Sequence, residues 1–347
     1  MAGLERNPRM DVVEADESRS AEWDAFVAGE RTGGVFHLWS WRPVFEHTFD
    51  VQPRYLLAEE GGSIRGVLSL VSIRQWSGRR ILSSLFGGVC SSVPAVRRSL
   101  LERAKELAAD GCSSRLFIRD DPAGFEGLPP SRVLPATILP LPREPGHLWR
   151  SLDPDERSAV RKARRGGMVT DEGPHYLPEF HRVYARNMRD LGTPALPFSY
   201  LEKVLASFPG RVEVIVAKKG GAVAAGMVNF AFGGRIQNLM AASLLSSRPD
   251  RPMDLLYWTA IEGAIGRGFA QFDMGRSQPG SGTHRFKQKW GGEDVELRSY
   301  EFRKGKQTFP KAGHGRAMAL CARLWRLLPL WAAGRLGPIV RRRIPMG

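Results

Sequence analysis

The chain has 347 residues, a formal net charge of +15 and 42% hydrophobic residues. Its length exceeds the roughly 250–300 residues beyond which one core usually splits, so we expect two domains with packed cores. The excess of Lys and Arg predicts an anionic partner, which is a nucleic acid, a phosphorylated cofactor or an acidic membrane. A basic surface without a specific ligand is the alternative.

Three further features limit the class of protein. Cys90, Cys112 and Cys321 are far apart and odd in number, so neither a disulfide framework nor a metal-ligand spacing is expected, and a reducing compartment is indicated. The first residues are charged and lack an apolar stretch, which predicts no signal peptide. No run of about 18 uncharged apolar residues occurs, so we expect a cytoplasmic chain without a spanning helix.

The first half of the chain begins with helical sequence at residues 17–29 and 39–49. Residues 56–68 (LLAEEGGSIRGVL) then give a strand, a two-glycine turn and a second strand, which is the pattern of a β-hairpin. A helix over 96–109 and a short apolar strand over 115–118 follow. The Pro-rich stretch 122–154 comes next, and we expect it to hold an extended strand near 136–141 before the second half begins.

The second half repeats this order. Helical sequence at 177–191 and 198–208 precedes a hairpin at 215–227 (IVAKKGGAVAAGM), a helix over 254–267 with Asp254 as its expected N-cap, and a strand over 271–274. The two hairpins align residue by residue, with Ala58, Gly61, Gly62 and Ile64 on Ala217, Gly220, Gly221 and Val223. Chance similarity of two Gly-Gly turns is the alternative, because glycine turns are common.

The repeated order resembles the GNAT fold, and its duplication resembles the Fem-type transferases of peptidoglycan bridge synthesis. Residues 157–169 (RSAVRKARRGGMV) are similar to the basic helix and glycine turn that open the second Fem half. Residues 187–194 (NMRDLGTP) and 272–292 (FDMGRSQPGSGTHRFKQKWGG) resemble FemAB-like proteins associated with exosortase and exopolysaccharide loci.

The resemblance implies an α/β (α+β) fold of tandem GNAT-like halves, each a mixed β-sheet flanked by helices. We expect a first half at 1–150, a second half with the active site at 151–305, and a basic amphipathic tail at 306–347. The resemblance also implies acyl transfer to an amine or hydroxyl of a cell-envelope or exopolysaccharide precursor. The acceptor would be a small molecule or a lipid- or nucleotide-linked glycan.

The implied donor is acyl-CoA or aminoacyl-tRNA, and the sequence leaves both open. The segment that corresponds to the GNAT pyrophosphate loop is usually rich in glycine, whereas here it reads SSRPDRPMD (246–254) without one. Arg248 and Arg251 of this segment are the expected donor contacts. No metal is expected.

The segment 272–292 concentrates reactive side chains after a strand, where ligands collect in α/β proteins. We predict that Asp273 and His284 handle protons, and that Lys287 and Arg276, with Ser277, hold a phosphate or an oxyanion. Lys287 also matches the functionally important lysine region of Fem-type enzymes. The alternatives are an ion pair between Asp273 and Arg276, a surface histidine, and a solvated lysine on a helix whose Phe286 and Trp290 are core.

Two other groups are assigned to ligands. Arg161 and Lys162 belong to a basic run that would grip donor or nucleotide phosphates, unless it is only a solvated helix face. Asn187, Arg189 and Asp190 precede a tight turn and would line the acceptor site, unless they only cap a helix.

The C-terminal segment has Leu320, Leu324, Leu327 and Trp331 at helical spacing, with arginines between them. A basic amphipathic helix with tryptophan is typical of membrane-surface binding, and packing against the body is the alternative. Two competing functions also remain open. One is nucleic-acid binding, with tRNA as a candidate partner, which rests on charge alone. The other is a degenerate transferase that acts as a scaffold in polysaccharide assembly.

Overall fold

The computed structural model describes residues 10–49, 51–110, 113–309 and 315–343. They form two compact units, each assembled from separate parts of the chain. The first unit contains residues 1–133, 297–310 and 342–347, and the second contains 134–296 and 311–341. The sequence segments 1–150, 151–305 and 306–347 remain our proposal for the extents of the two repeats and the tail.

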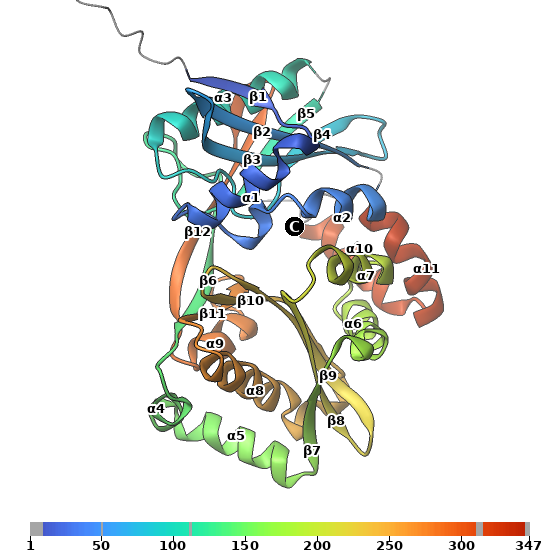
Figure 1. Ribbon diagram of the computed structural model, residues 1–347. Helices are drawn as coiled ribbons and strands as arrows, with labels where there is room; N and C mark the ends of the chain where they lie inside the picture. The colour runs from blue at the N-terminus through green and yellow to red at the C-terminus, as the bar shows by residue number, and fades with distance from the viewer. Residues whose placement is uncertain (1–9, 50, 111–112, 310–314, 344–347) are drawn as a thin grey trace, which may run out of the picture. The chain divides into compact units, whose positions relative to one another are not determined.

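The first unit is a sheet in the order β1-β2-β3-β4-β5-β12, in which β4 and β5 are parallel and the other neighbours antiparallel (Figure 1). The last strand comes from far along the chain. The elements are β1 (Asp11–Glu14), η1 (Glu17–Arg19), α1 (Ser20–Gly29), η2 (Val35–His37), α2 (Trp41–Thr48), β2 (Val51–Glu60), β3 (Ser63–Arg74), β4 (Arg80–Ser84), α3 (Pro94–Asp110), β5 (Ser113–Asp121), β12 (Glu293–Arg303) and β13 (Lys306–Thr308).

The second unit has the same pattern in the order β7-β8-β9-β10-β11-β6, with β10 and β11 parallel. Here the last strand, β6, comes from before the second repeat. The elements are β6 (Arg132–Pro140), α4 (Pro145–Ser151), α5 (Pro154–Arg165), β7 (Met168–Glu172), η3 (Pro174–Tyr176), α6 (Leu177–Asp190), α7 (Phe198–Ser207), β8 (Val212–Lys219), β9 (Ala222–Phe232), β10 (Arg235–Ser243), η4 (Leu245–Asp250), α8 (Pro252–Gly266), β11 (Gln271–Arg276), α9 (Gly282–Gln288), α10 (Gly315–Leu327) and α11 (Leu330–Arg341).

The two hairpins that suggested a repeat agree in detail. Gly61 and Gly62 join β2 to β3 with φ of +58° and +80°, and Gly220 and Gly221 join β8 to β9 with φ of +56° and +81°. Positive φ at both turn positions is the geometry that two glycines permit. Each hairpin also has its register shift just before the turn, after Ala58 and after Ala217. The predicted tandem mixed-sheet fold is therefore confirmed.

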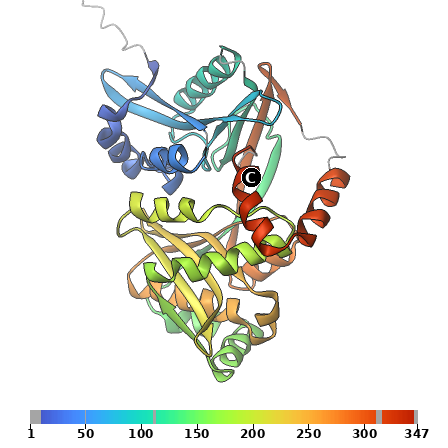
Figure 2. The same cartoon turned by 90° about the vertical axis from the view of Figure 1, so that its right-hand side faces the viewer.

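Helices cover both faces of each sheet. In the second unit, α8 packs through Leu255, Trp258 and Ile261 onto the face that carries Ile215 and Met227. The opposite face carries Gly226, where a Cβ would lie 2.6 Å from the ring of Phe180 on α6, so only glycine lets this helix approach (Figures 1 and 2). In the first unit, α3 covers the face of Leu56, Leu68 and Leu82.

The C-terminal segment is two helices, α10 and α11, interrupted at Pro329. Small residues bring the two helices close to the segment after α6. Ala322 of α10 lies against Gly192, and Gly337 of α11 lies against Ala195. Their large apolar residues are exposed by 42% to 79%, and these are Leu320, Leu324, Leu327, Leu330, Trp331, Leu336 and Ile339. One side of the pair therefore packs against the body, which was the alternative to membrane binding, and the other side is uncovered.

Two predicted helix caps were wrong. The helix α8 begins at Pro252, so Asp254 lies in its first turn and Arg251 is the N-cap, with a left-handed φ of +59°. The sequence THRFKQKW (283–290) predicts a short helix capped by Thr283, whereas α9 begins at Gly282 and is capped by Ser281, whose hydroxyl accepts the N–H of His284. Pro252 at the first helical position explains the earlier start of α8, since proline needs no hydrogen-bond acceptor there.

Candidate functional site

The candidate site lies where β10 and β11 stop pairing. These parallel strands are paired from Arg235 with Gln271 to Gln237 with Asp273. Beyond that point β10 shifts register between Asn238 and Met240, and β11 shifts between Asp273 and Arg276 as it continues along β6. The carboxyl ends of two parallel strands therefore separate at the segment that the sequence singled out, which is where ligands collect in such sheets.

Asp273 is 5% exposed, at the last paired position of β11. Its Oδ1 accepts the N–H of Gly275 at 2.7 Å, and its Oδ2 lies 3.9 Å from Nη1 of Arg235 on β10. Among the described residues it forms no ion pair with Arg276, so that alternative is not what the structure has. Burial raises the pKa of Asp273, and the Gly275 N–H and Arg235 act against this shift.

Lys287 projects from α9 and is also 5% exposed. Its Nζ donates to the carbonyl oxygen of Gly275 at 2.9 Å and to that of Arg276 at 3.1 Å. The solvated-lysine alternative is therefore wrong. The neighbouring Trp290 is fully buried and Phe286 packs against the same core, as the sequence predicted.

Burial lowers the pKa of Lys287 to about 8, while the nearby Asp273 carboxyl opposes the shift. A neutral lysine amine has two N–H bonds and one lone pair. The two carbonyl oxygens accept both N–H bonds, so the lone pair stays available to take a proton. The lowered pKa of Lys287 and the available lone pair of its amine both suit proton transfer near neutral pH.

His284 is buried and holds the loop before α9. Its Nδ1 accepts the N–H of Gly280 at 3.1 Å, so the proton sits on Nε2, which donates to Oδ2 of Asp294 at 2.8 Å. Oδ1 of Asp294 in turn accepts the hydroxyl of Thr137 on β6 at 3.0 Å. The surface-histidine alternative is therefore wrong, and both ring nitrogens of His284 already have protein partners.

Ser277 and Arg276 complete the segment. The backbone N–H of Ser277 donates to Pro135 on β6 at 2.9 Å, which fixes the chain at the end of β11. The Ser277 hydroxyl oxygen is buried and has no hydrogen-bond partner among the described residues. An orphan hydroxyl next to Lys287's carbonyl acceptors is a ready partner for a polar group that enters the site.

The start of α8 supplies positive charge. Arg248 on η4 and Arg251 are exposed, and no side chain caps the first turn of α8. Exposed arginines beside the N-terminus of a helix fit a phosphate, although the segment lacks glycine. Such a site suits the phosphates of CoA and those of an RNA equally well, so it does not decide between the two donors.

A buried acidic side chain of that first turn, Asp254, lies near a second one on α5. Burial, followed by the charge of the nearby Glu156 on α5, raises the pKa of Asp254 to about 6. Glu156 pairs with Lys289 at 2.9 Å. This pair was not among the predicted site residues, because Glu156 and Asp254 are far apart in the sequence.

The remaining predicted residues lie on other elements of the second unit. Arg161 and Lys162 are exposed on α5, more than a turn beyond Glu156. Asn187 is buried at the end of α6 and its amide donates to Ser243 at the end of β10, 2.9 Å away. Arg189 pairs with Asp190 at 3.1 Å and donates to the backbone of Arg326 on α10. The structure brings Asp273, Lys287, Arg276 and Ser277 together, whereas these residues lie outside that group.

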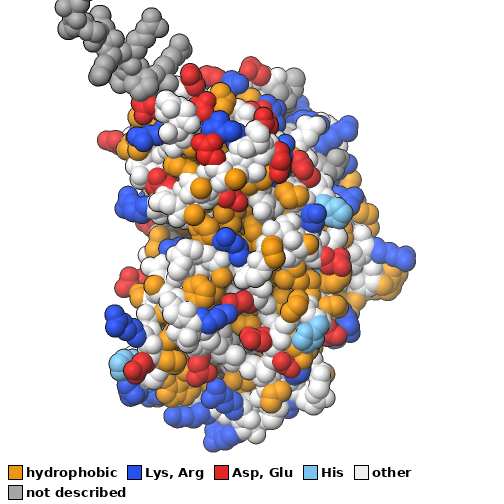
Figure 3. Space-filling model, in the orientation of Figure 1, with side chains coloured by type: hydrophobic (Ala, Val, Ile, Leu, Met, Phe, Trp, Pro, Cys, Tyr) orange, Lys and Arg blue, Asp and Glu red, His pale blue; other side chains and the backbone are white. Residues whose placement is uncertain are grey.

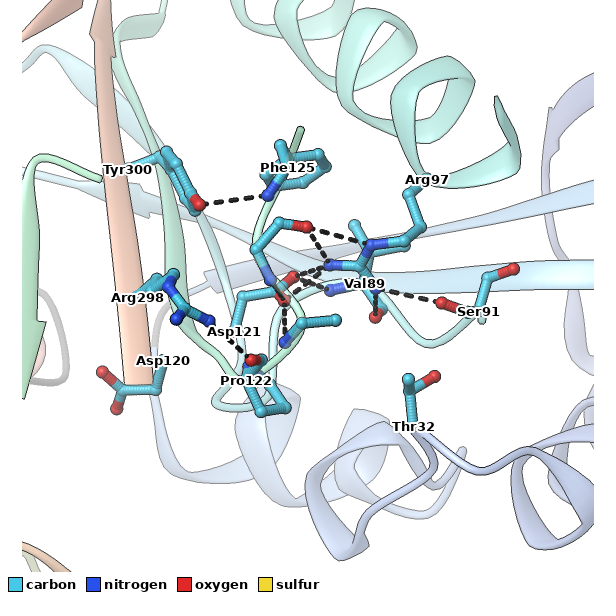
Figure 4. Close-up of polar contacts among 12 residues, drawn as sticks. Thr32, Val89, Ser91, Arg97, Asp120, Asp121, Pro122, Phe125, Arg298 and Tyr300 are labelled. Atoms are coloured by element: carbon cyan, nitrogen blue, oxygen red, sulfur yellow. Dashed lines mark hydrogen bonds and ion pairs between the residues drawn. The ribbon is translucent and has the colours of Figure 1, made fainter. Parts of the chain in front are cut away.

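In the first unit, the loop that corresponds to 245–251 is closed by a buried ion pair (Figure 4). Arg97 of α3 donates to Asp121 at 2.6 Å and to the carbonyl oxygen of Val89 at 2.7 Å. The Asp121 carboxylate accepts the N–H groups of Val89, Ala123 and Gly124. A carboxylate of the chain itself thus holds the loop before α3.

Among the described residues, no group of three or more His, Cys, Asp or Glu is placed to hold a metal ion. Likewise, no helix in the described part of the chain is long and apolar enough to cross a membrane.

A known family model matches part of the second unit. Residues 155–288 match the family model described as acetyltransferase (GNAT) domain. This span runs from α5 to the end of α9 and includes Asp273 and Lys287. No curated protein matches the chain in sequence.

Solved structures resemble nearly the whole chain. FemX is 16% identical with a TM-score of 0.65, and the match covers 85% of this chain and 98% of FemX. A tandem GNAT protein from the clavulanic acid biosynthesis pathway is 16% identical with a TM-score of 0.57, covering 86% and 100%. The C-terminal domain of a putative lysylphosphatidylglycerol synthetase from Agrobacterium fabrum is 12% identical with a TM-score of 0.55, covering 89% and 96%. The chain therefore has the tandem GNAT acyltransferase fold.

Proposed function

We propose that this chain is an acyltransferase whose second unit transfers an acyl group to an amine or hydroxyl of a cell-envelope or exopolysaccharide precursor. The observation that carries the proposal is Lys287, a buried amine held by two carbonyl oxygens beside the buried Asp273. The GNAT domain match over residues 155–288 supports the same reaction class.

In this proposal Lys287 acts as the base. As the acceptor nitrogen or oxygen attacks the acyl carbonyl, its proton passes to the Lys287 lone pair, and Asp273 stabilises the ammonium that forms. The orphan Ser277 hydroxyl donates to the developing oxyanion. When the bond to the donor's leaving group breaks, the proton passes from Lys287 to that group, and the lysine is neutral again. His284 keeps the loop in place through Asp294, so we assign it a positioning role.

The donor is an acyl-CoA or an aminoacyl-tRNA, and both carry phosphates. We assign Arg248, Arg251 and Arg276 to these phosphates, near the N-terminus of α8. The acceptor contacts that we propose are Asn187, Arg189 and Asp190, and Arg161 and Lys162 for a nucleotide-linked acceptor. The first unit is assigned no donor, because Asp121 fills the corresponding loop.

The C-terminal helices support a location at the inner face of the cytoplasmic membrane. Their exposed apolar residues stand beside Arg323, Arg326 and Arg335, and the chain has no Asp or Glu after Glu301. Figure 3 shows hydrophobic and basic side chains side by side at the right-hand edge, where Figure 1 places α11. Apolar side chains with only positive charges around them suit an anionic lipid surface. We propose that α10 and α11 seat the enzyme on the membrane that carries a lipid-linked acceptor.

The transfer reaction is tested with the full chain, radiolabelled acetyl-CoA or aminoacyl-tRNA, and lipid- or nucleotide-linked glycan precursors. Acyl product that forms with the wild type and not with Lys287→Met supports the proposal. Tight binding of precursors without transfer from any donor would instead favour the scaffold interpretation. Binding of RNA alone, without acylation, would favour a nucleic-acid-binding protein.

The membrane location is tested by sedimentation with phosphatidylglycerol-containing vesicles. The variant Leu324→Ser/Leu327→Ser/Trp331→Ser should lose binding. The control Val169→Ser/Leu245→Ser, which changes exposed apolar residues on β7 and η4, should keep it. Equal binding by both variants, or none by the wild type, would reject the membrane location.

A further inference from the structure

A second polar site lies in the first unit, on the sheet face that α3 covers. A cavity of about 200 Å³ opens there and is lined by Gln52, Arg54, Ser72, Arg80 and Ser113, with Leu107 of α3 at its edge. At about 30 Å³ for each water molecule in the liquid, this volume corresponds to about six waters. It is therefore large enough for a small polyatomic anion.

The strand register explains why these side chains meet. Gln52 on β2 is the partner of Ser72 on β3, and Arg80 on β4 is the partner of Ser113 on β5. Because side chains alternate along a strand, Arg54 shares a face with Leu56, and Arg80 shares a face with Leu82. Leu56 and Leu82 belong to the core under α3. The same face therefore changes from apolar to polar close to the C-terminal end of α3.

The polar groups converge from four strands. Arg80 donates from Nη1 to Gln52 and to Ser72, at 3.3 Å in each case. Arg54 donates from Nε to Glu14 at 2.7 Å, and its Nη1 and Nη2 groups have no acceptor among the described residues. The lining includes no Asp or Glu. Two guanidinium groups and two hydroxyls thus surround one small space.

This arrangement selects among anions. A carboxylate is planar and is satisfied by one arginine fork, whereas a phosphoryl group offers oxygens in several directions. Because the donors around the cavity come from four strands, they match the phosphoryl group better than a carboxylate. We propose that this cavity binds the phosphoryl group of a small molecule, such as a phosphate ester or a diphosphate, at a site separate in the chain from Asp273 and Lys287.

To test the proposal, the full chain is titrated with inorganic phosphate and with pyrophosphate at constant ionic strength. Calorimetry and the melting temperature measure binding. We expect saturable binding that Arg80→Gln weakens about tenfold or more, since a charge-assisted hydrogen bond is lost. The matched control is Arg79→Gln, the exposed neighbour with the same change of charge, which should bind like the wild type.

Arg54→Gln is the second variant, and it is used if Arg80→Gln fails to fold. It leaves only the exposed Glu14 without its partner, so we expect it to fold. It should also weaken pyrophosphate binding. Acetate at the same concentration should not compete. Any of three results would overturn the proposal. These are competition by acetate equal to that of phosphate, equal binding by Arg79→Gln and both cavity variants, and no saturable binding of pyrophosphate.

Discussion

The amine of Lys287 lies 2.9 Å from the carbonyl oxygen of Gly275, where β11 turns away from β10 with a left-handed φ of +74°. Main-chain carbonyl oxygens orient the amine without adding a full negative charge. Burial can therefore lower the pKa of this lysine, which a directly bonded carboxylate would have raised.

Replacing Lys287 by methionine should remove the proposed base and keep the volume of the side chain. We expect transfer to fall by about 10²–10⁴-fold, as for other general bases, with the melting temperature nearly unchanged. Initial rates and thermal unfolding measure the two effects. Lys203→Met on α7 is the control and should transfer normally. Full activity of Lys287→Met would remove this residue from the mechanism.

The pH dependence should follow the same amine. The neutral form increases as pH rises through about 8, so kcat/KM should increase about tenfold from pH 7 to 9. Lys287→Arg should lose this rise, because a guanidinium stays protonated. Stability should move in the same direction. The unfolded chain binds more protons than the native state between pH 8 and 10.5, so the free energy of unfolding gains a positive slope there, which Lys287→Met should remove.

His284 and Asp294 should act as one unit. His284→Gln and Asp294→Asn should each lower kcat, and the double variant should lose little more, with a coupling of about 0.5–3 kcal/mol. Because we assign them a positioning role, the pH profile should keep its midpoint near that of the wild type. A shifted or flattened profile in His284→Gln would instead show that His284 exchanges the proton itself.

Asp121 should matter for stability in the first unit. Asp121→Asn leaves the Arg97 guanidinium buried without its counter-charge, so we expect the free energy of unfolding to fall by about 3–5 kcal/mol. Denaturant titration measures this loss. Asp110→Asn, an exposed carboxylate at the end of α3, should change it little. A small loss in Asp121→Asn would mean that water or a neighbour replaces the carboxylate.

Asp254→Asn should stabilise the protein at neutral pH. The pKa of Asp254 in the native state is about 6, so the folded protein holds its proton more tightly between pH 4 and 6 and loses stability as pH rises through that range. Above pH 6 the Asp254 charge is buried and lies beside Glu156, and the neutral amide removes both costs, for about 1–2 kcal/mol at pH 7.5. At pH 4 the variant should gain nothing, and a gain at both pH values would point to packing.

The repeat and its hairpins were predictable because local rules decide them. Gly61-Gly62 and Gly220-Gly221 specify their turns by φ alone, and the apolar spacing of α8 specifies its buried face. The cluster of Asp273, Arg276, Ser277 and Lys287 was also predictable, since one short segment carries it. The buried carbonyl contacts of Lys287 were not, because they depend on the bulge in β11.

Contacts between residues far apart in the chain could not be predicted from the sequence. Asp121 and Arg97 are 24 residues apart and meet only when α3 packs beside β5. Gly87-Gly88 before a helix with Arg97 in its first turn was the one sequence signal for this contact. Glu156 meets Asp254 and Lys289 through the packing of α5 on α8. The caps of α8 and α9 were missed because Pro252 starts α8 before Asp254, and because Ser281 and Thr283 are both suitable capping residues.

The placement of β12 beside β5 affects how the chain is made. The first unit gains its last strand only when synthesis has reached Arg303, after most of the second unit has emerged from the ribosome. Until then β5 has one edge unpaired, and an open strand edge can pair with another nascent chain. A ribosome that stalls within the second repeat therefore leaves the sheet of the first unit without its last strand.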